Sequence, residues 1–359
     1  MKIKYLVRKS FFIQPFAIVF SFIFIGVFFI GCAKKTPIKS TRTENTIGTV
    51  CTITLFEKKP EPLFDEIFAA LDLLEQHVSV TIPTSDIALI NDAAGTNTPV
   101  VVNDDTFYIL NAAIKYAQLT KGAFDPSIGP LVKLWGIGTE DAHIPTKTQI
   151  DKAVNLVDYS KIKLDSQNKS VYLPQKGMRL DLGGIAKGYA ADLIVQILNQ
   201  HNSTKAIIDL GGNIYAFGEK SPATNTTNAV PWKVGVKNPF DSTGAPIVAI
   251  NLINKTVVTS GVYERYFIKD GIRYHHLLDR KTGYPVRNGL MSATIITDSS
   301  MFADALSTAF FVLGAKKGIA LLESLDGIEG FCVDENKIIT VTSGLKTKIT
   351  ILDSSFTEK

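Results

Sequence analysis

The sequence predicts an α+β fold, in which helices and short, largely hairpin-connected strands are interspersed. Apolar residues recur at helical spacing in several segments, and elsewhere they alternate with polar residues as in strands that bury one face. The regular strand–helix–strand rhythm of a doubly wound sheet is missing. Neither Gly-x-Gly-x-x-Gly nor a Walker phosphate loop occurs in the chain, so a Rossmann or nucleoside-triphosphatase fold has no local support.

The N-terminus has the layout of a bacterial export signal. Four basic residues among the first nine precede a charge-free apolar stretch at 11–30, and Gly31 then precedes Cys32. A small residue before cysteine is typical of a lipoprotein cleavage site, so lipidation is expected at Cys32. An uncleaved membrane anchor is the alternative, because the apolar stretch is about long enough to span a bilayer. Either way, the rest of the chain is expected in the cell envelope, on the periplasmic side of the inner membrane.

Composition narrows the class of the exported part. Without the signal, the chain has 38 − 4 = 34 Lys and Arg and 34 Asp and Glu. Its net charge is therefore close to zero, and no nucleic-acid partner is indicated. Cys51 and Cys332 stand in apolar, strand-like runs and are expected to be buried thiols rather than a disulfide or a zinc site. We predict a signal peptide at 1–31, a polar tether at 32–45 and one folded domain at 46–350.

The elements follow in order along that domain. A strand at 50–56 alternates threonine with apolar residues. The spacing of apolar residues predicts helices at 62–78, 106–120, 148–156 and 185–200. Alternation of apolar and polar residues predicts a hairpin-like pair of strands at 162–164 and 171–173, and further short strands between 206 and 258. A loop rich in glycine and proline is predicted at 122–138, and an exposed loop at 221–230.

The phrase at 179–192 is the first candidate for chemistry. A strand is expected to end at Asp181, two glycines allow close approach to the backbone, and a helix carrying Lys187 follows. Glycines before a helix N-terminus form a natural anion site. The alternative is a tight turn with Asp181 as a helix cap.

A second candidate lies at 299–314. Asp304 and Thr308 are four residues apart on a predicted helix and therefore share one face. A carboxylate and a hydroxyl are oxygen ligands that Mg²⁺ accepts. The alternative is structural, since a threonine within a helix can bond back to the preceding turn.

The segment at 258–285 contains two of the five histidines, His275 and His276. Neighbouring residues on a strand point to opposite faces, so one histidine can face a cleft while the other packs. The cleft-facing one could act as a general base. An ordinary structural pair remains the alternative.

Six motifs in order resemble the FAD:protein FMN transferase family, ApbE, from about Thr46 to Gly344. They are Thr46-Ile47-Gly48-Thr49, Gly122-Ala123-Phe124-Asp125-Pro126, the phrase at 181–192, Gly211-Gly212-Asn213, the block at 260–285 and Ala303-Asp304-Ala305-Leu306-Ser307-Thr308. The resemblance implies a T-fold-related, two-lobed α+β domain with antiparallel sheets flanked by helices and an FAD cleft between the lobes.

The resemblance also implies roles for individual residues. The positions that match FAD-binding positions of the family are Ile47, Thr81, Ala123, Phe124, Asp125, Asp181, Lys187 and His275. The matches to metal ligands are the backbone at Gly184 and Met301, and the side chains of Asp304 and Thr308. His276 matches the catalytic base. Where relatives commonly have Asp-Pro before a Thr-Gly turn, this chain has Asp279-Arg280, and loss of the proline should loosen that turn.

The activity that the resemblance implies depends on Mg²⁺ and uses FAD as substrate. The FMN half is joined by a phosphodiester bond to a threonine, and AMP leaves. The expected partners are exported redox proteins with an Asp-Gly-x-Ser/Thr-Gly-Ala-Thr-like motif and, through the lipid, the membrane surface. Two alternatives stay open, an FAD pyrophosphatase that yields FMN and AMP, and a lipid-anchored protein that stores FAD.

Overall fold

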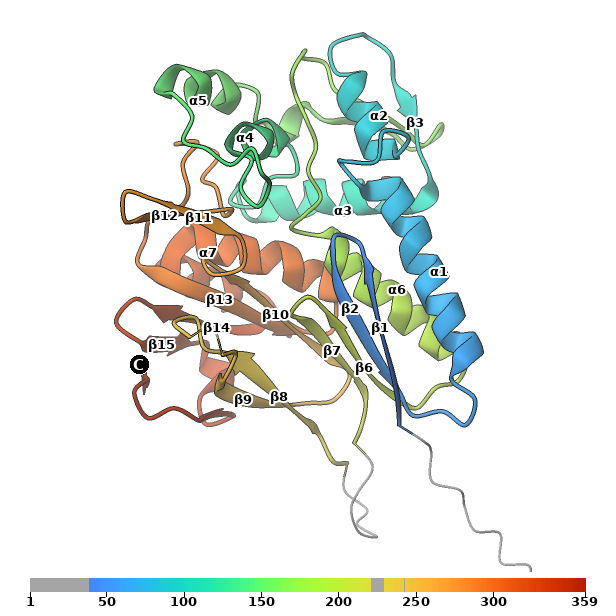
Figure 1. Cartoon of the computed structure of the whole chain (residues 1–359), viewed down its shortest axis with the longest axis vertical. Coiled ribbons are helices and arrows are strands. Elements are labelled where there is room, and N and C mark those ends of the chain that lie inside the picture. Colours follow the sequence, from blue (N-terminus) through green and yellow to red (C-terminus); the bar gives the residue numbers. More distant parts are fainter. Residues whose placement is uncertain (1–38, 221–228, 242) are drawn as a thin grey trace, which may run out of the picture. The chain divides into compact units, whose positions relative to one another are not determined.

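A nine-stranded sheet forms the centre of the computed structural model, which describes residues 39–220, 229–241 and 243–359 (Figure 1). Neighbouring strands run antiparallel except for the last pair, β15 and β17. The order across the sheet is β1 (Ser40–Thr46), β2 (Thr49–Leu55), β6 (Lys205–Leu210), β7 (Asn213–Gly218), β10 (Lys255–Gly261), β13 (Leu290–Thr297), β14 (Glu329–Asp334), β15 (Ile338–Val341) and β17 (Thr357–Glu358). The predicted α+β class is confirmed.

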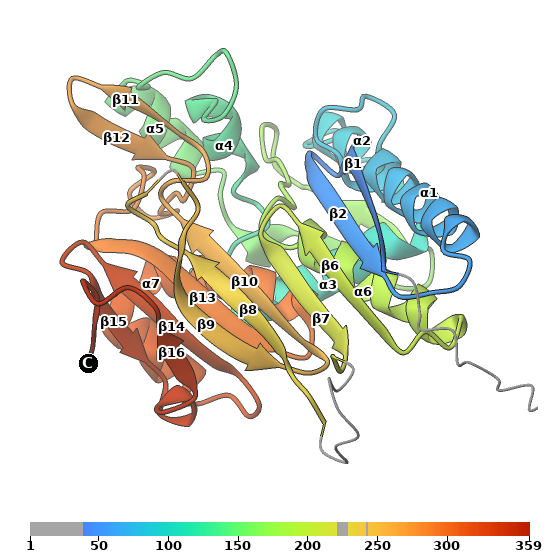
Figure 2. The ribbon, with the colours of Figure 1, turned by 60° about the horizontal axis from the view of Figure 1, so that its bottom comes forward.

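The two faces of this sheet are covered differently. Helices α6 (Ala186–Gln200) and α7 (Ser300–Leu322) pack on one face, with α1 (Glu61–Val78) and α3 (Asp104–Leu119) beside them (Figures 1 and 2). A three-stranded sheet packs on the other face, and its strands are β16 (Ile349–Ile351), β9 (Pro246–Leu252) and β8 (Trp232–Lys237). Strand β13 contributes side chains to the hydrophobic core on each face of the central sheet. Ile295 packs toward α7, and its neighbour Ile296 packs toward the three-stranded sheet.

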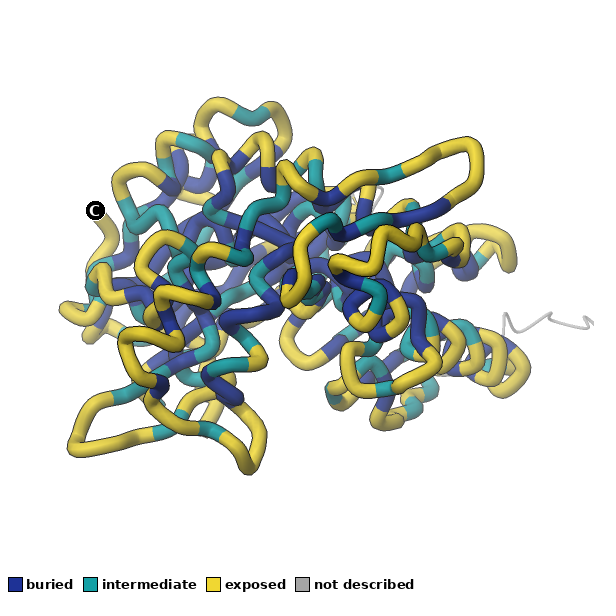
Figure 3. The backbone as a smooth tube through the Cα atoms, turned by 90° about the horizontal axis from the view of Figure 1, so that it is seen from above, coloured by how far each residue is buried: buried dark blue, intermediate teal, exposed yellow. Residues whose placement is uncertain are grey.

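Shorter elements surround one end of the central sheet. The two-stranded hairpin of β11 (Tyr266–Lys269) and β12 (Ile272–His275) lies beside α4 (Gly129–Trp135) and α5 (Lys147–Val154) (Figure 2). The remaining elements are α2 (Asp86–Asp92), β3 (Val100–Val101), β4 (Lys163–Asp165), β5 (Ser170–Tyr172) and two short 3-10 helices, η1 (Tyr159–Lys161) and η2 (Ser343–Leu345). Seen from above, exposed loops surround a buried centre (Figure 3).

The structure corrects three sequence predictions. The loop predicted at 122–138 contains α4, which Pro130 can begin and the left-handed Gly136 ends. The predicted tether overlaps β1, which pairs with β2 along its whole length. Thr41 and Thr43 alternate with Arg42 and Glu44 in this segment, and such alternation is compatible with a strand. No strand ends at Asp181, since this segment has only an isolated bridge between Ile128 and Arg179.

Other predictions are confirmed. Both cysteines that the structure describes, Cys51 and Cys332, are buried free thiols. Helix α7 is the one described helix with the length and apolar composition of a membrane span. It packs against α6, β10 and β13 and carries the buried Asp304, as expected for a core helix. The predicted lipidation site, Cys32, lies outside the described residues.

Candidate active site

A cavity of about 530 Å³ opens where segments far apart in the sequence meet. The turn between β1 and β2, the approach to α4, the N-terminus of α6, the end of β10, the residues after β12 and the first half of α7 all contribute. Members of four hydrophobic clusters line it, among them Phe124, Val236, Leu277 and Leu278. Charged and polar side chains of Lys187, Arg265 and Asp304 also line it.

The N-terminus of α6 forms one wall. Asp181 accepts a hydrogen bond from the Gly183 N–H at 2.8 Å and so closes a short turn before the helix. The residue before the helix, Ile185, provides no side-chain cap. Gly184 and Lys187 line the cavity on either side of it. A helix N-terminus next to a lysine favours bound anions, phosphates above all.

Oxygen-bearing groups from α7 and from the residues just before α6 line this wall. Asp304 is buried, and its Oδ2 accepts from the Gly188 N–H at 3.0 Å. A Cβ atom added to Gly184 would lie 3.2 Å from Thr308 Oγ1, so the Gly184 backbone and the Thr308 hydroxyl are neighbours. Burial raises the pKa of the Asp304 carboxyl, and the charge of Lys187 opposes this.

These oxygens fit a small divalent cation. A carboxylate, a hydroxyl and a backbone carbonyl are hard donors, and Mg²⁺ binds such sets together with water or phosphate oxygens. Within the described residues, no group of three or more His, Cys, Asp or Glu side chains could hold a metal. A site here would therefore depend on Asp304 and Thr308 with the Gly184 backbone.

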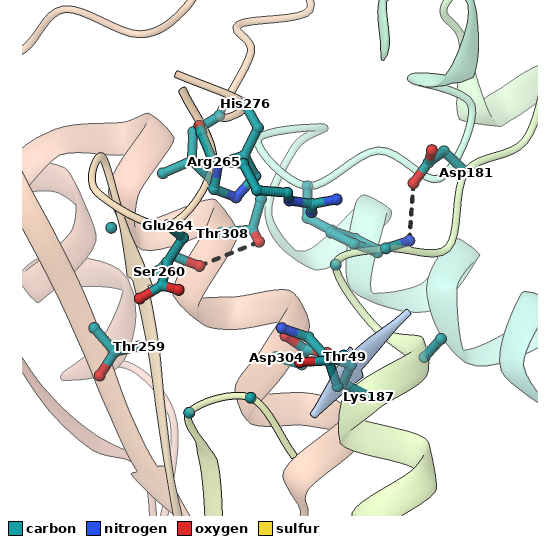
Figure 4. Close-up of a pocket in the computed structure, with 18 of the residues that line it drawn as sticks. Thr49, Asp181, Lys187, Thr259, Ser260, Glu264, Arg265, His276, Asp304 and Thr308 are labelled. Atoms are coloured by element: carbon teal, nitrogen blue, oxygen red, sulfur yellow. Dashed lines mark hydrogen bonds between the residues drawn. The ribbon is translucent and has the colours of Figure 1, made fainter. Parts of the chain in front are cut away.

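His276 lies across the cavity, directly after β12 (Figure 4). The backbone N–H of His276 donates to the Arg265 carbonyl at 3.1 Å, and its ring Nδ1 is 3.2 Å from the same oxygen. A contact with a carbonyl oxygen requires the proton on Nδ1, which leaves the lone pair on Nε2. Burial and the charge of Arg265 lower the pKa of His276 to about 3. The ring is therefore neutral near pH 7, and its Nε2 carries the lone pair that could accept a proton.

The sequence profile of the ApbE family matches residues 47–332. The chain belongs to the ApbE family. It is 36% identical to the FAD:protein FMN transferase of Treponema pallidum over 90% of this chain and 93% of that protein. It is 38% identical to the FAD:protein FMN transferase of Klebsiella pneumoniae over 82% of this chain and 90% of that protein.

Solved ApbE structures have the same fold. An ApbE protein of Thermotoga maritima superposes with a TM-score of 0.78 at 34% identity, covering 87% of this chain and 99% of that one. The flavinyl transferase ApbE of Pseudomonas stutzeri gives 0.75 at 28% identity, covering 87% of this chain and 97% of that one. The ApbE-like arrangement of antiparallel sheets and helices is confirmed.

Most residues selected from the sequence meet in this ApbE cavity. They are Ile47, Ala123, Phe124, Asp125, Asp181, Gly184, Lys187, His276, Asp304 and Thr308. Asp125 is buried, and its Oδ1 accepts from the Ser127 N–H at 2.9 Å and from the Ser127 hydroxyl at 2.6 Å. Burial raises the pKa of Asp125, and these hydrogen bonds offset only part of that rise.

Three selected residues do not line the cavity. His275 points the other way, is buried, places Nε2 2.9 Å from the Val286 carbonyl and packs edge-on against Phe311. Burial lowers the pKa of His275 to about 4. Thr81 is exposed in the loop after α1, and the Met301 N–H donates to Asp192 Oδ2 at 3.0 Å. Their binding roles remain predictions.

Several further polar residues, for which the sequence motifs indicated no role, also line the cavity (Figure 4). Figure 4 labels Thr49, Thr259, Ser260, Glu264 and Arg265 among them. Arg280 also lines the cavity. Ser260 lies 2.8 Å from the Ser307 hydroxyl and 3.5 Å from that of Thr308, so β10 and α7 contact each other beside the oxygen cluster. Arg265 lies four residues after the end of β10, and its closeness in sequence to Ser260 and Glu264 was the available signal.

Proposed function

We propose that this flavin transferase of the ApbE family joins the FMN half of FAD to a threonine hydroxyl of another exported protein and releases AMP. One observation carries the proposal. A neutral histidine, His276, and the oxygen cluster of Asp304 and Thr308 line the same cavity. Storage of FAD would require neither a proton acceptor nor a cation site, so this combination supports group transfer.

The chain's own residues would bind the pyrophosphate at the α6 wall. Lys187 and Arg265 line the cavity near Gly184, where the helix N-terminus also favours negative charge. Positively charged groups placed before the reaction stabilise charge that develops on transferring phosphoryl groups. Asp304, Thr308 and the Gly184 backbone would hold Mg²⁺, which when bound neutralises pyrophosphate charge and favours departure of AMP.

His276 would accept the proton of the incoming hydroxyl. The threonine oxygen forms a bond to the FMN phosphorus, the bond from that phosphorus to the bridging oxygen breaks, and AMP leaves with the bridging oxygen. The hydroxyl proton passes to His276 Nε2, which is free because Nδ1 faces the Arg265 carbonyl. The Arg265 carbonyl also holds the His276 backbone, so it fixes the ring's position.

A single reaction tests this function. The purified full-length chain is incubated with FAD, Mg²⁺ and a protein that carries the Asp-Gly-x-Ser/Thr-Gly-Ala-Thr-like motif, while AMP, free FMN and the acceptor's mass are followed. Transfer predicts equal amounts of AMP and FMN-bearing acceptor. FMN and AMP without a mass change would identify a pyrophosphatase, and unchanged FAD would identify a storage protein.

The cellular location of the chain is part of the same proposal. A basic N-terminus, an apolar stretch and Gly31-Cys32 support export and lipidation at Cys32. The anchor would hold the enzyme on the periplasmic side of the inner membrane. Its acceptors would then be exported redox proteins.

A further inference from the structure

Arg280 lies at the wall of the cavity, in the turn that the Gly283 N–H closes by donating to the Asp279 carbonyl. Its guanidinium Nη1 lies 3.4 Å from Asp125 Oδ2, and its Cζ lies 5.7 Å from the centre of the Tyr159 ring. Gly122 packs directly against it, because a Cβ atom added there would lie 2.4 Å from Cζ, Nε and Nη2. Residues from two separate segments, the loop at 122–125 and Tyr159, therefore hold this side chain in position.

The hydrogen bonds of this guanidinium are incomplete. An arginine has five N–H donors, and among the described residues the one bond found for Arg280 is the long contact with Asp125. The Arg280 Nε atom is buried and has no hydrogen-bond partner among the residues that the structure describes. A buried donor without a partner destabilises the protein, so a bound molecule that completes these bonds is favoured. The Arg280 side chain is 25% exposed, and its outer nitrogen atoms are therefore within a ligand's reach.

Asp125 provides an acceptor beside these donors. Its Oδ1 is used by Ser127, whereas Oδ2 faces Arg280. Apolar side chains of Phe124, Ile128 and Trp135 line the same part of the cavity. An apolar wall with a donor and an acceptor at its edge suits a flat nitrogenous ring whose own edge presents an acceptor beside a donor.

Both ends of FAD present such an edge. The isoalloxazine has an N–H between two carbonyl groups, and adenine has an amino group beside a ring nitrogen. We propose that Arg280 is a specificity-determining residue that, together with Asp125, recognises the edge of one of these two rings. The inference rests on the proposed function, because it takes FAD as the substrate.

Binding without metal tests the inference, because turnover then does not intervene. Dissociation constants for FAD, FMN and AMP are measured by calorimetry for the full-length wild type and for Arg280→Met, with flavin fluorescence as a second readout. Loss of a hydrogen bond to a charged group predicts weaker FAD binding by roughly tenfold to a hundredfold. Exactly one of the halves, FMN or AMP, should weaken by a similar factor, and that half identifies the ring.

Two further variants make the result specific. Arg280→Lys keeps the charge but loses the planar fork, so it should behave like Arg280→Met. Arg287→Met is the matched control, because Arg287 lies over the Tyr274 ring and does not line the cavity. It should leave all three constants within about twofold.

Several outcomes would overturn the inference. Unchanged FAD binding in Arg280→Met, equal weakening of FMN and AMP, full rescue by lysine, or the same loss in Arg287→Met would each do so. Failure of the proposed function would look different, because the reaction with an acceptor protein would then give free FMN or leave FAD unchanged, whereas the binding constants here are measured without turnover. A general folding defect would lower the thermal midpoint of Arg280→Met and weaken both halves alike.

Discussion

At the scale of single residues, His276 gives the most direct test of the chemistry. His276→Ala should lower transfer by roughly 10²–10⁴-fold, the usual range for a lost general base. FAD binding should change little, since Lys187, Asp125 and Asp181 still line the cavity. Single-turnover transfer at saturating FAD and acceptor measures the effect. A near-normal rate would remove the histidine from the mechanism, and His275→Ala is the control from the opposite face.

The pH dependence of the same residue can be stated with its sign. A histidine base works when neutral, so the rate falls as pH drops through its pKa. That pKa is lowered to about 3 in the free enzyme, against about 6.5 for an ordinary histidine. kcat/KM reports free-enzyme pKa values, so its profile should show no acidic limb near pH 6.5. A limb there that His276→Ala abolishes would show that the free-enzyme histidine titrates normally.

Asp304 tests the cation site. Asp304→Ala removes the buried carboxylate that lies one helical turn from Thr308 and lines the same cavity as Gly184. The variant should lose most activity and most Mg²⁺ affinity while keeping FAD affinity within a few-fold, because the flavin and adenine contacts remain. Calorimetric titration with Mg²⁺ and with FAD separates the two effects. Full activity in excess EDTA would contradict the metal's role.

At the scale of elements, the contact between α6 and α7 positions this cluster. A Cβ atom added to Gly188 would lie 2.3 Å from the Ser300 carbonyl oxygen and 2.6 Å from Met301 Cα. Gly188 also donates to Asp304, and one turn later Asp192 accepts from the Ser300 N–H at 2.7 Å. The two helices are therefore as close as their backbones allow.

Gly188→Ala should force α6 and α7 apart. Overpacking a tight contact destabilises a protein by about 1–3 kcal/mol, and Asp304 should shift away from Gly184. Urea unfolding measures the first effect and Mg²⁺ titration the second. The control on the same helix is the exposed Gln196→Ala, which should change neither. A Gly188→Ala variant as stable as the wild type would show that the helices can separate without cost.

The same elements show what the sequence could and could not reveal. Helical spacing correctly put Asp304 and Thr308 on one face, and the pleat correctly separated His275 from His276. The spacing of residues in the sequence cannot reveal that α6 packs against α7. That contact depends on Gly188 lying against the backbone of Ser300 and Met301, which are far away in the sequence. Arg280 reaches Asp125 through an equally distant contact. Helix α4 was missed because its glycines and proline are also frequent in loops.

At the scale of the whole molecule, Cys32 tests the anchor. Cys32→Ala should leave the signal uncleaved or release the chain from the membrane fraction, because lipidation requires that thiol. Fractionation and intact mass spectrometry measure both results. Cys51→Ala is the matched control, because this thiol is buried within β2 and should not affect localisation. Unchanged mass and membrane retention in Cys32→Ala would contradict lipidation.

The position of Ile47 has a consequence for reach. Ile47 lines the cavity immediately after β1, the strand on which the described chain enters the domain. The eight residue steps from Cys32 to Ser40 can span at most about 29 Å, and the six steps along β1 add about 20 Å. A lipid at Cys32 would thus keep this part of the cavity within about 50 Å of the bilayer surface. If this anchor and the proposed transfer both hold, only threonines that other exported proteins present within that distance of the bilayer could receive FMN.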